Sequence, residues 1–203
     1  RGLGDVYKRQ ISYSRQLLER DSFGQYVRDF FANGGGGLNV TVPFKLLAHD
    51  SADWLHESAQ DAAAANTLAY GKNGIEAWNT DGAGLVNDLM GRCGQSIVAK
   101  RILILGAGGA AQGIIGPLLD SGPASLTVAN RTHSKAAQLI DRAALKYPEV
   151  ELKALSLQEL AGAAGSFDLI INSTSLGLHG DEVSIQPIIA VNAFCYDLSY
   201  GPT

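Results

Sequence analysis

The stretch KRILILGAGGAAQGIIGPLLDSGPASLTVANRT, residues 100–132, decides the fold of this chain. Residues 101–105 are a short apolar run of the kind that is buried in a parallel sheet. Gly106, Gly108 and Ala111 follow at the positions of a G-x-G-x-x-A dinucleotide-binding loop. In such a loop the glycines allow a tight turn beside a pyrophosphate, and the amides that start the next helix face the anion. The pattern predicts a strand, a nucleotide-binding loop and a helix; a glycine-rich turn that binds nothing is the alternative.

The residues after the next predicted strand indicate which dinucleotide this loop binds. An NAD site carries a carboxylate about 20 residues after the glycines, where it binds the ribose 2′-hydroxyl. This chain has Asn130, Arg131 and Thr132 there instead, followed by Lys135. A 2′-phosphate would find Arg131 as a forked donor and Lys135 as a point charge. We therefore predict NADP as the cofactor, with a solvated surface arginine as the alternative for Arg131.

The remainder of the second half alternates strands with helices. We expect helices at residues 110–119 and 134–144, and strands at 125–129, 151–155, 167–172 and 194–197. Alternation of this kind predicts an α/β fold with a Rossmann-type doubly wound parallel sheet. This NADP-binding domain is expected to cover residues 83–203.

The first half predicts a smaller α/β substrate domain at residues 11–82, which we expect to be incomplete. Its expected elements are strands at 11–18 and 38–42, helices at 23–32 and 58–65, and a hairpin of 66–70 with 75–78. The glycine run at 33–37 suggests a phosphate loop, but no Gly-Lys-Ser/Thr follows, and a turn that closes the preceding helix is the better interpretation. Pro43 is expected to open a short helix, and Asp81 to cap a helix at 82–89.

The composition argues against several classes of function. The 203 residues are 46% hydrophobic and 18% charged, enough for one large or two small domains with hydrophobic cores. A net charge of −4 without a basic stripe argues against nucleic acid as a partner. The sequence has no membrane-length apolar run and no signal-sequence pattern. We expect a cytoplasmic protein, monomeric or homodimeric, whose partner is a small-molecule substrate.

Cysteine and histidine form no disulfide or metal pattern. Cys93 and Cys195 have no framework or C-x-x-C spacing, so we expect a reducing compartment and thiols that are buried or inert. His49 and Asp53 stand at helical spacing, but a solvated helix face explains them better than a metal pair does. We therefore expect no metal ion.

Two polar clusters in the first half could carry chemistry, because each lies next to a constrained backbone. In NVTVPFK, residues 39–45, Thr41 and Lys45 project from a strand end and from the first helical turn. In NTDG, residues 79–82, Asp81 lies between a strand and a helix. Taken separately, Lys45 could equally be a surface lysine and Asp81 a helix cap. Together, beside a cofactor domain, they are the acid/base and carboxylate pair that hydride transfer to a carbonyl requires.

Seven motifs occur along the chain in the order NVTVPFK, AANTLAY, NTDGAG, GAGGAAQG, NRTHSKA, INSTSLG and CYDLSY. Together they resemble the shikimate dehydrogenase family, and the resemblance extends over about residues 13–200. It implies an oxidoreductase that uses NADPH to reduce 3-dehydroshikimate to shikimate, a step of chorismate and aromatic amino-acid biosynthesis.

The resemblance also implies roles for individual residues. Lys45 and Asp81 would be the catalytic pair, and the substrate would also contact Thr41, Asn66 and Tyr200. The cofactor would be held by Gly106, Ala107, Gly108, Gly109 and Ala110 at its pyrophosphate, by Asn130, Arg131, Thr132 and Lys135 at its adenosine phosphate, by Ser173, Thr174 and Ser175 at its ribose, and by Leu198 at its nicotinamide.

The chain departs from this family at both ends. Residues 1–10 lack the two serines with which the family grips the substrate carboxylate, and they resemble a non-native leader. After residue 203 the family continues with a substrate-contacting glutamine and with helices that close the first domain. We therefore expect an unstable first domain and doubtful activity of the truncated chain. A quinate/shikimate-type dehydrogenase with looser substrate or NAD use, and a non-catalytic NADP-binding fragment, are the alternative functions.

Overall fold

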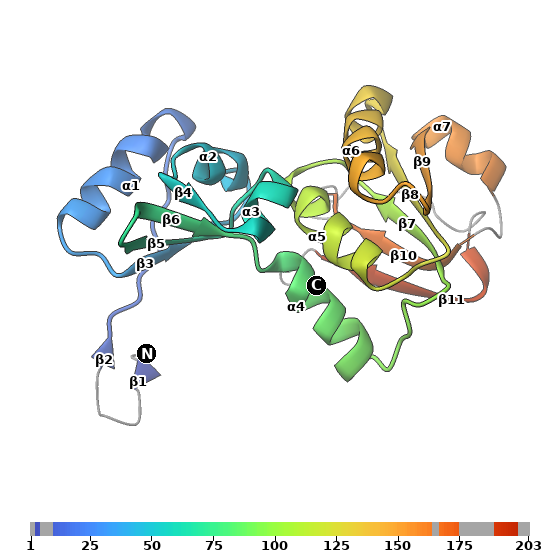
Figure 1. Ribbon diagram of the computed structural model, residues 1–203, viewed down its shortest axis with the longest axis horizontal. Helices are drawn as coiled ribbons and strands as arrows, with labels where there is room; N and C mark the ends of the chain where they lie inside the picture. Colours follow the sequence, from blue (N-terminus) through green and yellow to red (C-terminus); the bar gives the residue numbers. More distant parts are fainter. Residues whose placement is uncertain (1–2, 5–9, 164–166, 175–188, 199–203) are drawn as a thin grey trace.

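The computed structural model describes residues 3–4, 10–163, 167–174 and 189–198. Within these ranges the chain forms a four-stranded and a five-stranded sheet, and helix α4 (Asp81–Asn87) connects the two (Figure 1). A short antiparallel pairing of β1 (Leu3–Gly4) with β2 (Gln10–Ile11) lies near the N-terminus.

The five-stranded sheet has the order β11-β10-β7-β8-β9, and every neighbouring pair in it is parallel. Its strands are β7 (Arg101–Leu105), β8 (Ser125–Asn130), β9 (Glu151–Ser156), β10 (Phe167–Asn172) and β11 (Ile189–Asp197). The chain order reverses between β7 and β10, which is the switch point where doubly wound sheets bind ligands. The predicted Rossmann-type sheet is therefore confirmed, with the strands at 101–105 and 167–172 correct to the residue.

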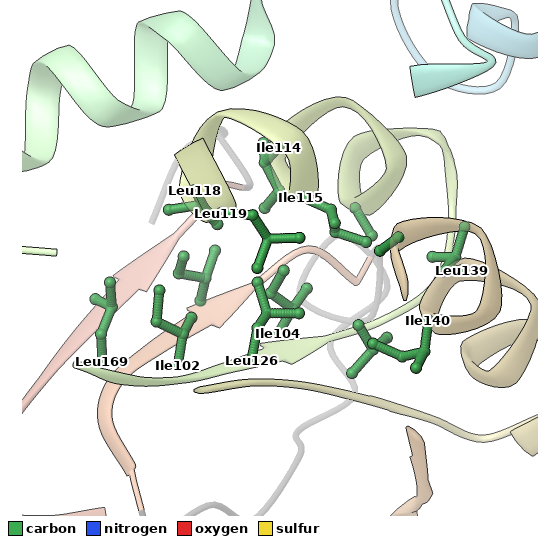
Figure 2. Close-up of a cluster of buried hydrophobic side chains, with 14 of the residues drawn as sticks. Ile102, Ile104, Ile114, Ile115, Leu118, Leu119, Leu126, Leu139, Ile140 and Leu169 are labelled. Carbon is green, nitrogen blue, oxygen red and sulfur yellow. The ribbon is translucent and has the colours of Figure 1, made fainter. Parts of the chain in front are cut away.

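Helices cover both faces of this sheet. On one face lie α5 (Gly109–Asp120) and α6 (His133–Lys146), and on the other lies the short α7 (Leu157–Leu160), followed by a 3-10 turn, η3 (Ala161–Ala163). Ile102 and Ile104 pack under α5, whereas Leu103 and Leu105 pack on the side of Leu160 (Figure 2 shows the α5 side). Because both faces are covered, the central strand β7 is apolar and buried from Ile102 to Leu105.

The four-stranded sheet has the order β3-β5-β6-β4. It is built from β3 (Gly37–Asn39), β4 (Trp54–Leu55), β5 (Thr67–Gly71) and β6 (Gly74–Trp78), and it is accompanied by α1 (Phe23–Ala32), α2 (Lys45–Asp50) and α3 (Glu57–Ala62). The predicted hairpin is confirmed, because β5 and β6 pair antiparallel up to Gly71 and Gly74.

Helix α1 agrees with the sequence prediction to the residue, and the interpretation of the glycine run as its closing turn is confirmed. Gly34 has a φ of 83°, a left-handed conformation that favours glycine. The amide of Gly34 donates to the carbonyl of Phe31, and the amide of Gly35 donates to that of Phe30. This pair of bonds is a Schellman C-cap.

Four predictions for the elements of the first half were wrong. The strand expected at 11–18 ends at Ile11, because the side chains that follow find no surface to cover: Leu17 is 93% exposed. The strand expected at 38–42 ends at Asn39, because the backbone turns where the amide of Phe44 donates to the carbonyl of Thr41.

The helix after that strand begins at Lys45 rather than at Pro43. The helix expected at 58–65 ends at Ala62, because Ala63 adopts a left-handed φ of 44° and turns the chain.

The two cysteines form no disulfide. Cys93 is half-buried and Cys195 is exposed, so burial was the wrong expectation for Cys195. The reason is its place on β11, the outermost strand of the sheet, where its neighbours Phe194 and Tyr196 pack against the core below α5. Partial desolvation nevertheless raises the pKa of the Cys195 thiol, which keeps it protonated at neutral pH.

Helix α4 continues into a π-helical turn, η2 (Asp88–Arg92), and packs against α5. A Cβ atom on Gly82 would lie 2.5 Å from the carbonyl oxygen of Gly113, so the two helices approach closely at this point. Leu85 and Leu89 of this segment belong to the core of the five-stranded sheet. No helix in the described part of the chain is long and apolar enough to cross a membrane.

Candidate functional site

A salt bridge between Lys45 and Asp81 is the centre of the candidate site. The Nζ atom of Lys45 lies 2.8 Å from Oδ2 of Asp81, and the side chains are 14% and 25% exposed. Each residue is the first of its helix, Lys45 of α2 and Asp81 of α4. The pair is thus partly shielded from water yet open enough for a ligand to reach it.

Asn66 completes this cluster. Its Nδ2 atom donates to Oδ1 of Asp81 at 2.9 Å and to the hydroxyl of Thr80 at 2.9 Å, and its Oδ1 atom accepts from the amide of Thr80 at 3.1 Å. Both carboxylate oxygens of Asp81 are therefore held, one by an ammonium and the other by an amide. Lys45, Asn66 and Asp81, which lie apart in the sequence, are therefore joined in one hydrogen-bond network.

The prediction that Asp81 caps a helix was wrong. The N-cap position belongs to Thr80, and Asp81 is already the first residue of α4. Its carboxylate points to Lys45 and Asn66 instead of to an amide of its own helix. In the contact with Lys45 both partners carry a charge, whereas a capping bond to a backbone amide would have a charge on the carboxylate alone.

The pair lies beside the predicted nucleotide-binding loop. Gly109 is the first residue of α5, and a Cβ atom on it would lie 3.4 Å from Cβ of Lys45. The side chain of Lys45 therefore passes the start of the helix whose amides were expected to face an anion.

The loop itself has the shape that a dinucleotide requires. Gly106 has a φ of 102°, and its amide donates to the carbonyl of Ala129 at 2.8 Å. A Cβ atom on Gly108 would meet nothing within 4 Å, so the space in front of this residue is open. Gly108 is also the N-cap of α5 and has no side chain to bind the first amides of that helix. These features fit a pyrophosphate.

Three further predicted residues, Ser173, Thr174 and Leu198, lie at the carboxyl ends of β10 and β11. The amide and the hydroxyl of Thr174 donate to Oδ1 of Asn172 at 3.1 and 2.7 Å. The amide of Leu198 donates to the carbonyl of Asn172 at 2.9 Å. Ser173 binds the end of β7, because its hydroxyl donates to the carbonyl of Leu105 at 2.7 Å. Thr174 and Leu198 thus stand at the carboxyl ends of neighbouring strands.

The residues expected at an adenosine phosphate lie between the end of β8 and the first turn of α6. Asn130 donates from Nδ2 to the carbonyl of Thr132 at 2.9 Å, and Thr132 is the N-cap of α6. Arg131 and Lys135 are exposed, and no salt bridge to another described residue is present for either. Two cations next to a helix N-terminus fit a phosphate.

Other predicted residues are not brought into this network. Thr41 is exposed in the turn before α2, and its backbone carbonyl accepts a hydrogen bond from the amide of Phe44. Ser175 and Tyr200 lie outside the described residues.

His49 contacts Asp50, with Nδ1 and Oδ1 2.8 Å apart, whereas Asp53 accepts from the amide of Ile75. Among the described residues there is no cluster of three metal-ligating side chains.

Sequence reasoning missed one residue of the site, Asn79, which it named only as part of a polar cluster. Asn79 is 6% exposed and accepts from the amide of Asp81 through Oδ1 at 3.1 Å. Its spacing of two residues from Asp81, typical of an Asx turn, was the available signal.

Both halves of the chain are similar to known proteins. Residues 88–179 match the family model described as shikimate / quinate 5-dehydrogenase, and residues 6–68 match that of the shikimate dehydrogenase substrate binding domain. A protein of Aromatoleum aromaticum named shikimate dehydrogenase (NADP(+)) is 44% identical, with 95% of this chain and 68% of the relative covered. A protein of the same name from Vibrio cholerae is 46% identical, with 96% and 68% covered.

Solved structures are similar as well. The Ael1 enzyme of Pseudomonas putida aligns with a TM-score of 0.70 at 32% identity, over 88% of this chain and 73% of that one. Shikimate dehydrogenase of Aquifex aeolicus aligns with a TM-score of 0.75 at 30% identity, over 91% and 66%. A shikimate dehydrogenase in complex with NADP+ aligns with a TM-score of 0.72 at 29% identity, over 90% and 64%.

Proposed function

The chain belongs to the shikimate dehydrogenase family, and on that premise we propose that it is an NADP-dependent oxidoreductase that reduces 3-dehydroshikimate to shikimate. This reaction is a step of chorismate and aromatic amino-acid biosynthesis. The observation that carries the proposal is the Lys45–Asp81 salt bridge beside Gly109, because it joins an acid/base pair to the start of the cofactor helix.

Reduction of a ring ketone needs a hydride for the carbonyl carbon and a proton for the oxygen. Bound NADPH supplies the hydride. The ammonium of Lys45 donates a hydrogen bond to the carbonyl oxygen, stabilises the negative charge that develops there, and gives up its proton. Asp81 holds that ammonium in place at 2.8 Å.

The same cluster suits a polyhydroxylated substrate. Asp81 accepts and Asn66 donates hydrogen bonds, so together they can bind neighbouring hydroxyl groups of a ring. We place Thr41 and Tyr200 among the substrate contacts on the family resemblance. Thr41 would reach the substrate from the exposed turn before α2.

The cofactor would be held along the carboxyl ends of the parallel strands. We assign the pyrophosphate to the backbone of residues 106–110, where the glycines leave room for it. Asn130, Arg131, Thr132 and Lys135 would bind the adenosine 2′-phosphate. Thr174 and Leu198 would border the ribose and the nicotinamide. Among these residues, Arg131 and Lys135 are the ones that favour NADP over NAD.

A second candidate is a quinate/shikimate-type dehydrogenase with looser substrate or NAD use, since the matching family description names both shikimate and quinate. A third is a non-catalytic NADP-binding fragment. The Lys45–Asp81 pair argues against the third, because a protein that only binds NADP does not need a partly buried ammonium beside a carboxylate. The division into a substrate domain at 11–82 and a cofactor domain at 83–203, the leader at 1–10, the cytoplasmic location and the monomeric or homodimeric state stay predictions.

One assay separates these functions. The loss of NADPH absorbance is followed with 3-dehydroshikimate and, in parallel, with 3-dehydroquinate, and each reaction is repeated with NADH. Turnover of 3-dehydroshikimate with NADPH well above the three other combinations is the expected result. Similar rates with both ketones or both cofactors would favour the second candidate, and NADPH binding without any turnover would favour the third.

A further inference from the structure

So far the side chain of Asn79 enters the site only as the acceptor for the backbone amide of Asp81, and it is one of two buried polar side chains in the described part of the chain, the other being Thr127. Burial of an amide is costly unless its donors and acceptor are used. The contacts of Asn79 therefore indicate what its burial achieves.

Asn79 ties the start of α4 to the segments around α3. Its backbone amide donates to the hydroxyl of Ser58 at 3.0 Å, and its Nδ2 atom donates to the carbonyl of Ala64 at 3.0 Å. Its Oδ1 atom accepts from the amide of Asp81 at 3.1 Å. The backbone of the carboxylate residue is thus held by the side chain of Asn79, which is itself anchored at Ala64, while the backbone of Asn79 is anchored at Ser58.

The same side chain also lies directly against the cofactor helix. A Cβ atom on Gly113 of α5 would lie 2.8 Å from Oδ1 and 2.9 Å from Nδ2 of Asn79, closer than real Cβ atoms approach other atoms. Because Gly113 has no side chain, the amide group of Asn79 can occupy this space. Four residues earlier, Gly109 starts the same helix and lies against Lys45.

We propose that Asn79 is a positioning residue, which sets the carboxylate of Asp81 relative to Lys45 and makes that position depend on its fit against Gly113. The inference rests on the proposed function for its catalytic meaning. Asn79 contacts α5, the helix that begins at the nucleotide-binding loop, and it also contacts Asp81, the residue that holds the catalytic ammonium.

The first test compares substitutions of Asn79 with the substitution of a second asparagine, Asn87, which serves as the control. Asn79→Ala removes the acceptor for the amide of Asp81, and kcat for 3-dehydroshikimate is expected to fall about tenfold to a hundredfold, because small misplacements of a catalytic group are costly. NADPH binding is expected to stay unchanged. Asn79→Ser keeps a weaker acceptor at the same place and should recover part of kcat. Asn87→Ala, at the exposed end of the same helix, is the control without effect.

The second test uses the contact with Gly113 as a coupling measurement. Gly113→Ala favours the helix locally, but its Cβ displaces the Asn79 amide, so kcat is expected to fall in the wild-type background. In the Asn79→Ala background there is no side-chain amide for this Cβ to displace, so Gly113→Ala should not lower kcat any further. Independent, multiplicative losses in kcat would contradict the proposed coupling.

A third measurement needs no turnover, so it separates this inference from the proposed function. Acetylation of lysines by an amine-reactive ester is followed peptide by peptide, with exposed Lys72 as the internal reference. Lys45 is expected to react several-fold faster in Asn79→Ala and in Gly113→Ala than in the wild type or in Asn87→Ala. Wild-type protein that fails to oxidise NADPH would overturn the proposed function alone. Unchanged labelling of Lys45 in Asn79→Ala, or an unchanged kcat in an otherwise active protein, would overturn the positioning role.

Discussion

Gly106 and Ser173 lie so close across the switch point that a Cβ atom on Gly106 would stand 2.8 Å from Oγ of Ser173. Ser173 cannot easily move away, because its hydroxyl and its amide both donate to the carbonyl of Leu105, at 2.7 and 2.8 Å. Gly106 also has a φ of 102°, in the region that side chains disfavour. The path of the nucleotide-binding loop thus depends on this glycine.

Gly106→Ala is therefore expected to displace the loop. We expect a loss of stability of about 1–3 kcal/mol from backbone strain, together with a higher dissociation constant for NADPH. Urea unfolding and a fluorescence titration with NADPH measure the two effects. Gly116→Ala on α5 is the control, since its Cβ would meet only the hydroxyl of Tyr147 at 3.8 Å. Unchanged NADPH affinity in Gly106→Ala would exclude this loop as the pyrophosphate site.

Arg131→Ala tests the choice between NADP and NAD. A hydrogen bond to a charged group contributes about 1.5–3 kcal/mol, so loss of the guanidinium should weaken NADPH binding by at least about tenfold. NADH binding should barely change, because NADH has no 2′-phosphate for Arg131 to bind. Arg28→Ala on α1, in the other half of the chain, controls for a general loss of positive charge. An equal loss of affinity for both cofactors would place Arg131 outside the phosphate site.

The salt bridge between Arg101 and Asp168 predicts a pH dependence of stability. The guanidinium donates to both carboxylate oxygens at 2.8 and 3.0 Å, and the amide of Arg101 adds a bond at 2.9 Å. These hydrogen bonds lower the pKa of Asp168 from 3.8 to about 2. Because the pKa is lower in the folded state, the contribution is complete above about pH 4 and is lost as the pH falls from 3.8 toward 2.

Asp168→Asn should therefore reduce the free energy of unfolding at neutral pH, by about 1 kcal/mol for a partly exposed pair. The difference from the wild type should shrink toward acid pH, where the wild-type carboxylate is itself protonated. Urea unfolding at several pH values measures this, with the exposed Asp141→Asn as the matched control. A difference that stays constant between neutral and acid pH would argue against the salt bridge as its source.

The elements of the nucleotide-binding half could be predicted because their signals are local. The run at 101–105 is bounded by charged residues and by glycine, and its burial on both faces follows from its apolar character. Helix α1 was equally predictable, since Phe23, Val27 and Phe31 mark its buried face and Gly34 marks its end. The residues that begin and end each of these elements lie within the element or directly next to it in the sequence.

What could not be predicted depends on partners far away along the chain. Residues 11–18 have the character of a strand, but a strand forms only next to another one, and residues 11–17 lie exposed. The sequence paired Asp81 with Lys45, which is 36 residues away, but it did not show that this contact would replace the helix cap. Asn79 could not be recognised as buried, since its contacts lie at Ser58, Ala64 and Gly113.

The central claim is that Lys45 acts on the substrate next to a cofactor that other residues hold. The most direct measurement compares kcat and the NADPH dissociation constant of Lys45→Ala with those of the wild type and of the exposed Lys72→Ala. Loss of a positioned proton donor should lower kcat by about 10² to 10⁴, with NADPH binding unchanged. Equal losses in turnover and in NADPH binding would make Lys45 a structural residue and would contradict the account.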